Sequence, residues 1–310
     1  MKLFFITLIQ IVLVPAVSPL LVGIVRKVKA RLQNRRGASI VQPYWDLAKL
    51  FHKDEIISRD ASWLFRIAPY IVFGVTLVLA AGLPSMLAVS GVPVLSDFIL
   101  FVYAVALGTF FLALAGMDTG SGFGGFGASR EMTVAALTEG GLLFSLLAVA
   151  LATGTTNFGD MILRLQELPF TQYLPIVLAF VSFVIALIAE TGRIPVDNPA
   201  THLELTMIHE AMILEYSGKR LALMEWASAN KLFIFMTLGA NVFFPWGVAT
   251  QLDFGSLLGA LGLLVIKLLA CGIGVAVLES TIAKLRFFRL PDLLFTSLVL
   301  GVIAVVIIVI

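Results

Sequence analysis

Eight apolar runs divide the chain and determine which fold it can adopt. They cover residues 3–25, 64–89, 98–115, 133–152, 174–189, 232–248, 257–278 and 293–310. An α-helix needs about 20 apolar residues to cross a bilayer, so each run is a candidate membrane span. Only 13% of the residues are charged, against about 25% in a soluble domain. The sequence therefore predicts an all-α polytopic membrane protein with about eight transmembrane helices, forming one integral membrane domain over residues 1–310.

The basic residues are distributed unevenly among the connections between these runs. Of the 21 lysines and arginines, 18 fall in alternate connections, which places them on one face of the membrane. The positive-inside rule assigns this face to the cytoplasm, and eight spans put both termini on one side. The first run is too long for a signal-peptide core, so we interpret it as a retained helix. We therefore expect a multi-pass protein of the cell membrane whose polar loops face the cytoplasm.

The polar stretch at residues 190–218 is the main functional candidate. Its charged and histidine side chains are Glu190, Asp197, His202, Glu204, His209, Glu210 and Glu215. Apolar residues and two prolines stand among these acids, which favours a packed loop over a solvated one. A buried carboxylate must be paired, solvated or neutralised, and acids at membrane depth mark ion pathways by default. The sequence therefore predicts a folded acidic loop that takes part in ion movement.

The Asn198-Pro199 pair within this stretch has the form of an N-cap followed by proline at the first helical position. A helix starting there carries His202 and His209 on one face and Glu204 on the opposite face. The two histidines are then about 10.5 Å apart, which is too far to chelate one metal ion. The single cysteine, Cys271, lies in an apolar run and excludes an internal disulfide or cysteine-ligated cluster. We therefore expect no metal site in this chain.

Six glycines between residues 116 and 127 predict a loop whose backbone turns sharply and approaches its neighbours closely. No strand precedes it, so phosphate binding is disfavoured. The loop leads through Arg130 and Glu131 into a helix that contains Glu139. Small residues surround Glu139 in that helix and suit either close helix packing or water. Glu139 is then either a structural acid bonded to a neighbouring helix or a proton carrier.

Two further features concern charged residues beside or inside apolar runs. Residues 43–51 carry apolar side chains at helical spacing, which predicts a short amphipathic helix in the membrane interface, beside basic residues suited to lipid or to a partner subunit. Lys267 and Glu279 share one apolar helix but are about 18 Å apart along it, so they do not pair. We expect Lys267 to have a partner elsewhere in the fold, such as a carboxylate.

Three motifs in order give the chain a family resemblance. ETGRIPVD followed by EYSG, the loop RRGASIVQPYWDLAKLF, and DTGSGFGGFGASRE resemble the membrane subunit that forms the quinone-site floor of respiratory complex I. They are still more similar to its homologue in energy-converting (group 4) [NiFe] hydrogenases. The resemblance implies eight transmembrane helices, no cofactor bound by this chain, and a hydrophilic arm docked on the cytoplasmic face. It places the [NiFe] centre and iron–sulfur clusters in partner subunits, beside antiporter-like membrane subunits, and no nucleic acid is expected.

The resemblance also implies roles for individual residues. In the family, electron transfer in the arm drives ion movement through buried carboxylates, and the matching acids here are Glu139, Glu190, Asp197, Glu204 and Glu215. Lys267 and Glu279 are added to the predicted pathway because they are charged residues of an apolar helix. The residues predicted to dock the arm or line the cavity beneath it are Arg35, Arg36, Asp46, Asp118, Arg130, Glu131, Arg193, His202, His209 and Glu210. The chain itself is predicted to hold no redox centre and no catalytic residue.

The chain departs from the complex I pattern at two places. Val196 stands where complex I has phenylalanine, and the segment 197–215 is less dense in acids. These departures favour a ferredoxin-linked hydrogenase over a quinone-binding subunit of a complex I-type NADH dehydrogenase, with a membrane-bound sulfane reductase as a further alternative. The formate hydrogenlyase type ranks lower, because its version of this loop is shorter than the loop in this chain. A stand-alone ion transporter is disfavoured because no inverted repeat is evident, and a passive anchor leaves Glu139, Lys267 and Glu279 unexplained.

Overall fold

The computed structural model describes residues 2–88, 92–169, 173–198, 207–250 and 253–310. The secondary structure of these residues is helical and contains no β-strand, as the apolar runs predict. The helices are α1 (Lys2–Leu32), α2 (Gln42–His52), α3 (Trp63–Gly82), η1 (Pro93–Ser96), α4 (Phe98–Asp118), α5 (Gly122–Thr153), α6 (Phe158–Leu165), α7 (Tyr173–Glu190), α8 (His209–Ile213), α9 (Gly218–Val242), α10 (Phe254–Thr281), η3 (Phe287–Arg289) and α11 (Leu290–Val309).

Local side-chain caps explain where several of these helices begin. The side chains of Ser62, Asp97 and Asn157 accept hydrogen bonds from backbone N–H groups in the first turns of α3, α4 and α6. Such caps satisfy donors that have no partner inside the helix. Gly154 ends α5 with a backbone φ of 66°, a left-handed conformation that glycine adopts without strain.

Seven helices in the described part of the chain are long and apolar enough to cross a membrane, namely α1, α3, α4, α5, α7, α10 and α11. The eighth predicted span falls on α9, which is 25 residues long. Its first half carries Glu225, Asn230 and Lys231, and its second half, residues 232–242, is buried throughout. A helix enclosed by other helices needs no uniformly apolar surface, which explains why α9 is less apolar than its neighbours.

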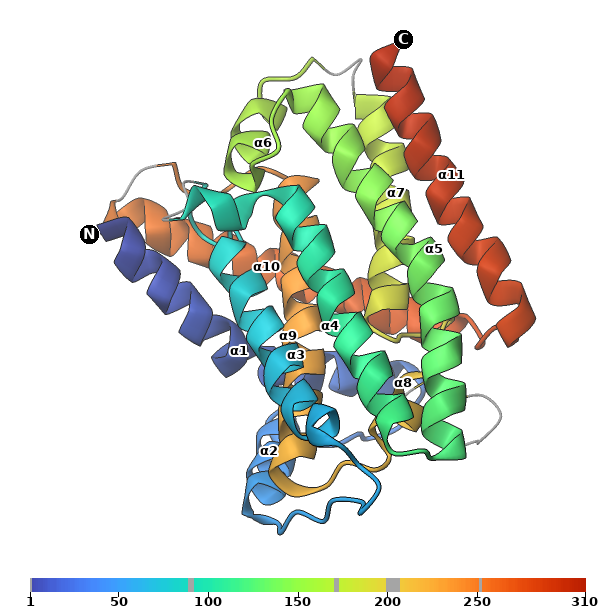
Figure 1. The fold of residues 1–310 in the computed structure, drawn as a ribbon. Coiled ribbons are helices and arrows are strands. Elements are labelled where there is room, and N and C mark those ends of the chain that lie inside the picture. Colours follow the sequence, from blue (N-terminus) through green and yellow to red (C-terminus); the bar gives the residue numbers. More distant parts are fainter. Residues whose placement is uncertain (1, 89–91, 170–172, 199–206, 251–252) are drawn as a thin grey trace.

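The long helices run alternately up and down through the bundle (Figure 1). The connections that carry α2 and α8, and the turn between α4 and α5, gather at the lower end in that view. The short helix α6 and the two chain ends lie toward the upper end. We refer to these as the α8 end and the α6 end. This arrangement confirms that alternate connections share a face, as the distribution of basic residues predicts.

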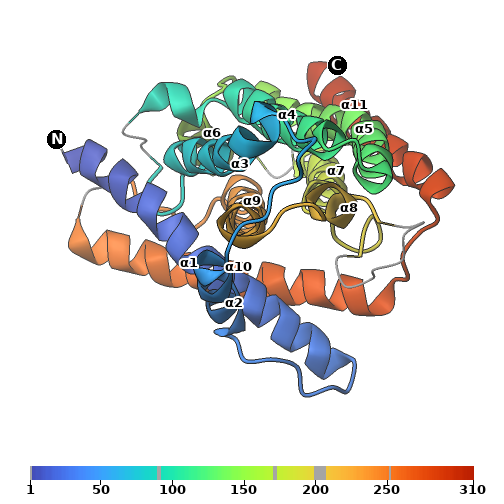
Figure 2. The same ribbon diagram turned by 60° about the horizontal axis from the view of Figure 1, so that its bottom comes forward.

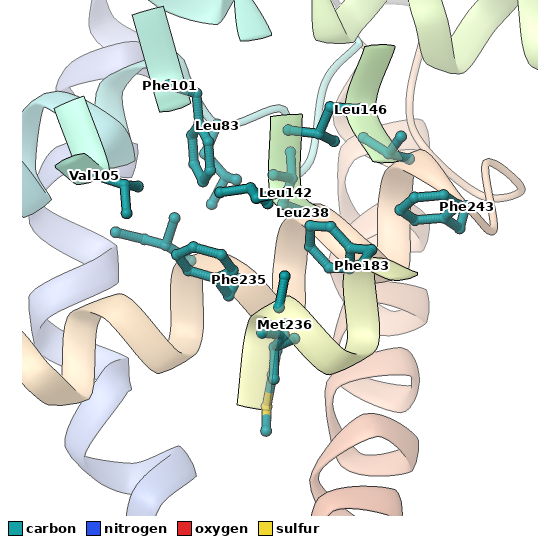
Figure 3. Packing of buried hydrophobic residues seen from close by; sticks show 14 of the residues in the cluster. Leu83, Phe101, Val105, Leu142, Leu146, Phe183, Phe235, Met236, Leu238 and Phe243 are labelled. Carbon is teal, nitrogen blue, oxygen red and sulfur yellow. The ribbon is translucent and has the colours of Figure 1, made fainter. Parts of the chain in front are cut away.

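The central helix of the bundle is α9. Viewed from the α8 end, it lies between α3 and α4 on one side and α10 on the other, with α7 beside it (Figure 2). Its buried half carries much of the main apolar core, part of which is drawn in Figure 3. Phe235 of α9 packs against Phe101 of α4 and Phe183 of α7, with ring centroids 5.5 and 6.1 Å apart.

Two prolines inside α1 are accommodated by neighbouring side chains. A proline removes the N–H that would bond the carbonyl four residues earlier, so Pro19 frees the carbonyl of Pro15. The indole N–H of Trp226 on α9 donates to this carbonyl at 2.8 Å. The α1–α9 contact is therefore partly a hydrogen bond that the proline makes available.

The predicted amphipathic helix is present as α2 and is bound to the bundle. The Tyr44 hydroxyl donates to the Ala16 carbonyl of α1. Phe51 packs edge-on against Trp226 of α9, with ring centroids 6.0 Å apart. The helix is thus held at the α8 end of the bundle by contacts with the middle of α1 and the first half of α9.

The predicted glycine-rich loop is mostly helix, so that prediction is wrong. Helix α4 continues to Asp118 and α5 begins at Gly122, which leaves a turn of three residues. A Cβ on Gly124 would lie 2.0 Å from the carbonyl oxygen of Gly116, and a Cβ on Gly127 would lie 2.8 Å from the Cβ of Ala211. The glycines therefore allow α4, α5 and α8 to approach closely, which confirms the close approach predicted for this stretch.

A neutral, close-packed contact joins α5, α7 and α11, and we call it the α5–α11 seam. It comprises Gly140, Gly141, Ser182, Ser297 and Gly301. A Cβ on Gly141 would lie 2.4 Å from Ser297 Oγ, and one on Gly301 would lie 2.9 Å from the Cβ of Phe144. Ser182 Oγ donates to the Ser297 carbonyl at 2.7 Å, and Ser297 Oγ donates to the Ser182 carbonyl at 2.9 Å. The small residues next to Glu139 thus serve helix packing.

Candidate functional site

A cavity of about 700 Å³ opens at the α8 end of the bundle. It is lined by α1, α3, α4, α5, α7, α8, α9 and α10, and by the segments after α1 and α7. Its charged lining residues are the acids Glu131, Glu190, Asp197, Glu210, Glu225 and Glu279, the bases Arg26, Lys29, Arg35, Arg193 and Lys231, and His209. Eight residues predicted from the sequence therefore meet in one place.

The wall of the cavity formed by α3 and α4 is uncharged and mostly apolar, with Thr76 and Thr109 as its hydroxyl-bearing residues. Val72, Val75 and Leu79 of α3 face the cavity together with Val105 and Leu112 of α4. The charged residues come instead from α1, α5, α7 to α10 and the segments between them. The cavity is therefore amphipathic and holds a charged wall beside an apolar one.

Glu190 ends α7 and is only 9% exposed. The ammonium of Lys231 on α9 lies 2.6 Å from its carboxylate. A carboxylate buried to this degree needs a partner of opposite charge, because removing a charge from water is costly. The pair joins α7 to α9 at the depth where α9 becomes apolar.

Glu279 near the end of α10 is 5% exposed and pairs with two cations. Lys29 of α1 lies 2.7 Å from one carboxylate oxygen, and Arg193 of the segment after α7 lies 3.0 Å from the other. As predicted, Glu279 does not pair with Lys267. This three-membered group joins α1, α10 and the segment that follows α7.

Asp197 is 3% exposed and holds several backbone segments together. Lys284, in the connection between α10 and α11, lies 2.7 Å from one carboxylate oxygen. The backbone N–H groups of Asn198 and His209 donate to Asp197 at 2.8 and 3.1 Å. Asp197 thus fixes the start of α8 and the floor of the cavity.

Two titratable groups of α8 face the cavity outside the membrane-spanning segments. The pKa of Glu210 is raised to about 7, chiefly by burial and also by the negative charges of Glu225 and Asp197, while Arg26 opposes the rise. Burial lowers the pKa of His209 below its ordinary value; Asp197 opposes this shift, and Lys231 adds to it. Glu210 can therefore gain and lose a proton near neutral pH.

Two acids of α5 lie near the Glu190–Lys231 pair. Glu131 lines the cavity, and its electrostatic neighbours are Lys231, Glu190 and Asp197. Glu139 is partly buried and lies outside the lining, with Glu190 and Lys231 as its electrostatic neighbours. The two acids are eight residues apart, about 12 Å along the helix. Glu131, Glu190 and Glu139 therefore lead from the cavity toward the interior of the bundle.

Several predicted site residues lie elsewhere. Lys267 donates to Asn241 Oδ1 at 3.1 Å and to the Phe244 carbonyl at 2.7 Å, so its described partners are neutral and not a carboxylate. Asn241 lies in the last turn of α9 and Phe244 directly follows this helix, at the α6 end. Glu215 is exposed and does not line the cavity.

The remaining predicted docking residues have local roles or lie at the surface. Asp118 accepts hydrogen bonds from the Ser62 and Phe65 N–H groups at the start of α3. Arg130 donates to the Met207 carbonyl at 2.9 Å. Asp46 accepts from Gln42 one turn earlier in α2, at 2.8 Å, and Arg36 is exposed. The predicted helix start at Pro199, together with His202 and Glu204, lies outside the described residues.

Sequence reasoning missed the cavity residues Arg26, Lys29, Glu225 and Lys231. It also missed Lys284, which pairs with Asp197 without lining the cavity. Arg26 and Lys29 are three residues apart at the end of α1, a spacing that puts them on one helix face. Glu225 and Lys231 precede a buried run on α9. Both patterns indicate charged side chains that face inward. The partners of Lys29 and Lys231, which are Glu279 and Glu190, are distant in sequence, so no local pattern identifies them. Within the described residues, no group of three or more His, Cys, Asp or Glu side chains is arranged to hold a metal ion.

The fold and the cavity define a class of protein, an all-α polytopic membrane protein with an amphipathic, ion-paired cavity at one end. Residues 4–310 match the family model described as NADH dehydrogenase. The chain is also 30% identical to an NADH-quinone oxidoreductase subunit of Wolbachia pipientis wMel over 292 residues, covering 86% of this chain and 84% of the relative. The chain therefore belongs to the NADH dehydrogenase family of membrane proteins.

Relatives with higher identity come from hydrogenase systems of Escherichia coli strain K12. Formate hydrogenlyase subunit 4 is 36% identical over 284 residues, covering 92% of each chain. Hydrogenase-4 component C is 36% identical over 297 residues, covering 96% of this chain and 93% of that one. The formate hydrogenlyase type matches as strongly as hydrogenase-4, so the lower rank given to it from the loop length is wrong.

One solved structure shares the whole fold. The structure of a membrane-bound sulfane sulfur reductase, an archaeal respiratory membrane complex, aligns with a TM-score of 0.85 at 22% identity. The alignment covers 99% of this chain and 100% of that chain. At this identity the likeness establishes the fold alone.

Proposed function

We propose that this chain is the membrane coupling subunit of a multi-subunit, redox-driven ion pump of the membrane-bound [NiFe] hydrogenase type. The observation that carries the proposal is the cavity at the α8 end, where six carboxylates meet five cations and His209 beside an apolar wall. The hydrogenase-4 and formate hydrogenlyase relatives support the choice of enzyme type. In this proposal ferredoxin is the electron donor, and the redox centres lie in partner subunits.

The α8 end faces the cytoplasm and docks the hydrophilic arm in this proposal. Its support is the concentration of basic residues in the connections that meet there, which fits the positive-inside rule. Arg35 and Arg36 follow α1 at this end and are exposed, so they are available to acidic groups of a partner. Antiporter-like subunits would contact the bundle from within the membrane.

The chain's contribution to coupling is to hold and release protons at paired carboxylates. A change in the charge of the docked arm would shift the protonation equilibrium of the Glu190–Lys231 pair, because the pair is buried and weakly screened. Glu131 lies on the cavity side of this pair, and Glu139 lies toward the bundle interior. A proton taken up from the cavity would therefore pass Glu190 before it reaches Glu139. The translocated ion is H⁺ in this scheme.

A second candidate function is binding of an apolar electron acceptor in the cavity, as in a quinone-binding subunit. The apolar wall that α3 and α4 present beside the charged residues favours it. The NADH-quinone oxidoreductase relative supports the same choice. The two functions differ in whether the cavity must accommodate a molecule larger than water.

The decisive experiment compares Glu139→Gln with Glu215→Gln in vesicles that carry the intact complex. Glutamine keeps the shape of glutamate and cannot titrate. The proposal expects Glu139→Gln to retain redox turnover and to lose coupled ion uptake, whereas Glu215→Gln retains both because Glu215 is exposed and outside the cavity. Glu139→Asp should retain part of the uptake, since the acid remains with a shorter reach. A normal ion-to-electron ratio in Glu139→Gln would show that Glu139 is only structural.

The orientation is tested separately with two exposed positions. A cysteine replacing Glu215, next to α8, should react with a membrane-impermeant reagent from the cytoplasmic side only. A cysteine replacing Glu167, just after α6, should react from the opposite side only. Labelling of both positions from one side would contradict the proposed topology.

A further inference from the structure

Lys267 carries a charge that the described part of the chain does not neutralise. Its ammonium has three N–H donors, and two of them bond the neutral oxygens of Asn241 and Phe244. No carboxylate of the described residues forms an ion pair with it. Lys267 lies within the spanning helix α10, where a cation is stable only if it meets an anion or water. Among the described residues, the site therefore holds a cation without a matching anion.

A groove of about 530 Å³ lies next to this lysine at the α6 end. It is lined by the first turns of α7 and by the segment after α9, and its residues are Tyr173, Leu174, Ile176, Val177, Phe180, Phe243, Phe244 and Trp246. Five of these eight side chains are aromatic. Its volume falls in the range of about 300–1,000 Å³ that small-molecule sites occupy.

Phe244 connects the cation to the groove. Its carbonyl accepts the hydrogen bond from Lys267 at 2.7 Å, and its ring lines the groove. The ring lies 5.1 Å from that of Phe180 and 6.4 Å from that of Trp246, measured between centroids. A molecule with an anionic group at Lys267 and an apolar chain against these rings would use both features.

We propose that Lys267 and this groove bind an anionic phospholipid, with the phosphate at Lys267 and one acyl chain in the groove. Leu174, Val177 and Trp246 are 64%, 53% and 58% exposed, so the groove opens toward the periphery of the bundle, where lipid lies. Tryptophan and tyrosine collect at the depth of lipid headgroups, and lysine extends its ammonium to the same depth. A carboxylate on a partner helix could neutralise Lys267, but it would leave the aromatic groove empty.

The test measures which lipid occupies the groove in the purified intact complex. Trp246 lines the groove and reports on it, because bromine atoms on an acyl chain quench tryptophan fluorescence on contact. The signal is the quenching that disappears in Trp246→Phe. Brominated phosphatidylglycerol, which is anionic, is titrated against brominated phosphatidylcholine, which is zwitterionic.

We expect phosphatidylglycerol to bind about five-fold more strongly than phosphatidylcholine, the ratio that one lysine near an anionic headgroup supplies. Lys267→Gln should abolish this preference, and Lys267→Arg should retain it. Lys27 is the control, since its described hydrogen bonds likewise go to neutral oxygens, the carbonyls of Gly37 and Ala38, but it is not next to the aromatic groove. Lys27→Gln should leave the preference unchanged.

Two results would overturn the proposal. Equal binding of the two lipids by the wild-type complex would show that Lys267 recruits no anionic headgroup. Absence of any Trp246-dependent quenching in the intact complex would show that a partner protein covers the groove. Both measurements use the wild-type chain, so they do not depend on how well a Lys267 variant folds.

Discussion

The cavity and the α5–α11 seam place polar groups inside the bundle in opposite ways. Around the cavity, the buried carboxylates of Glu190, Asp197 and Glu279 lie within 3.0 Å of cations, next to open volume. In the seam the polar groups are the hydroxyls of Ser182 and Ser297, which bond backbone carbonyls across a glycine contact. Charges need partners and room, whereas hydroxyls can be satisfied in a dry contact.

The two ways of placing polar groups occur at different positions along α5. The helix faces the cavity at Glu131 and packs into the seam at Gly140 and Gly141, with Glu139 just before the seam begins. The region that can change its charge is therefore joined by one helix to a region whose geometry is fixed. The following predictions test this contrast, beginning with the largest expected effect.

Lys231→Met should cause the largest loss of stability because it leaves Glu190 buried without its partner. Breaking a buried ion pair from one side costs about 3–5 kcal/mol. Adding Glu190→Gln should restore most of the loss, since no unpaired charge then remains. The measurement is thermal unfolding in detergent, followed by the reaction of the partly buried Cys271 thiol with a dye. Lys219→Met, at an exposed position of the same helix, is the control and should be nearly neutral.

Gly141→Ala should disrupt the seam. The new Cβ would lie 2.4 Å from Ser297 Oγ, so α5 and α11 must move apart, at a cost of about 1–3 kcal/mol. Gly274→Ala is the matched control, because it is also a glycine in a membrane helix and a Cβ there meets nothing within 4 Å. The two variants are compared by the same unfolding assay. Equal losses would mean that the seam is less tightly packed than its geometry indicates.

The cavity should respond to pH through Glu210. The pKa of this group rises from 4.5 to about 7 in the folded chain, so between these pH values the folded chain retains a proton that the unfolded chain has lost. Stability should therefore fall as pH rises from about 4.5 to 7 and level off above 7, by about 1–2 kcal/mol after allowance for partial exposure. Glu210→Gln should remove this dependence. Gly141→Ala, in the neutral seam, should retain the wild-type pH profile.

Ser182→Ala should have the smallest effect. It removes the hydroxyl that donates to the Ser297 carbonyl, yet Ser297 Oγ can still donate to the Ser182 carbonyl. Hydrogen bonds between membrane helices contribute about 0.6 kcal/mol on average. A loss of stability as large as that of Lys231→Met would show that the cavity and the seam do not differ in the way proposed.

Hydropathy and charge spacing were sufficient to predict the helices, because bilayer thickness sets the length of a spanning run. The amphipathic pattern at residues 43–51 likewise predicted α2, which spans Gln42–His52. The close backbone approach predicted for the glycine-rich stretch is confirmed, but the stretch was predicted as a loop and is mostly helix, because glycine is common both in turns and at close helix contacts. The tertiary contacts distinguish a turn from a close helix contact: Gly124 lies against Gly116, and Gly127 lies against Ala211.

By itself, the sequence determined that this is an all-α membrane protein with its acids and bases concentrated at one end. The tertiary structure decided which of those charges meet. Glu279 pairs with Lys29 and Arg193, and Glu190 with Lys231, across separations in sequence that no local pattern encodes. It also assigned Lys267 to neutral partners at the α6 end. Pairing depends on how helices pack around α9, and packing is a property of all the helices together.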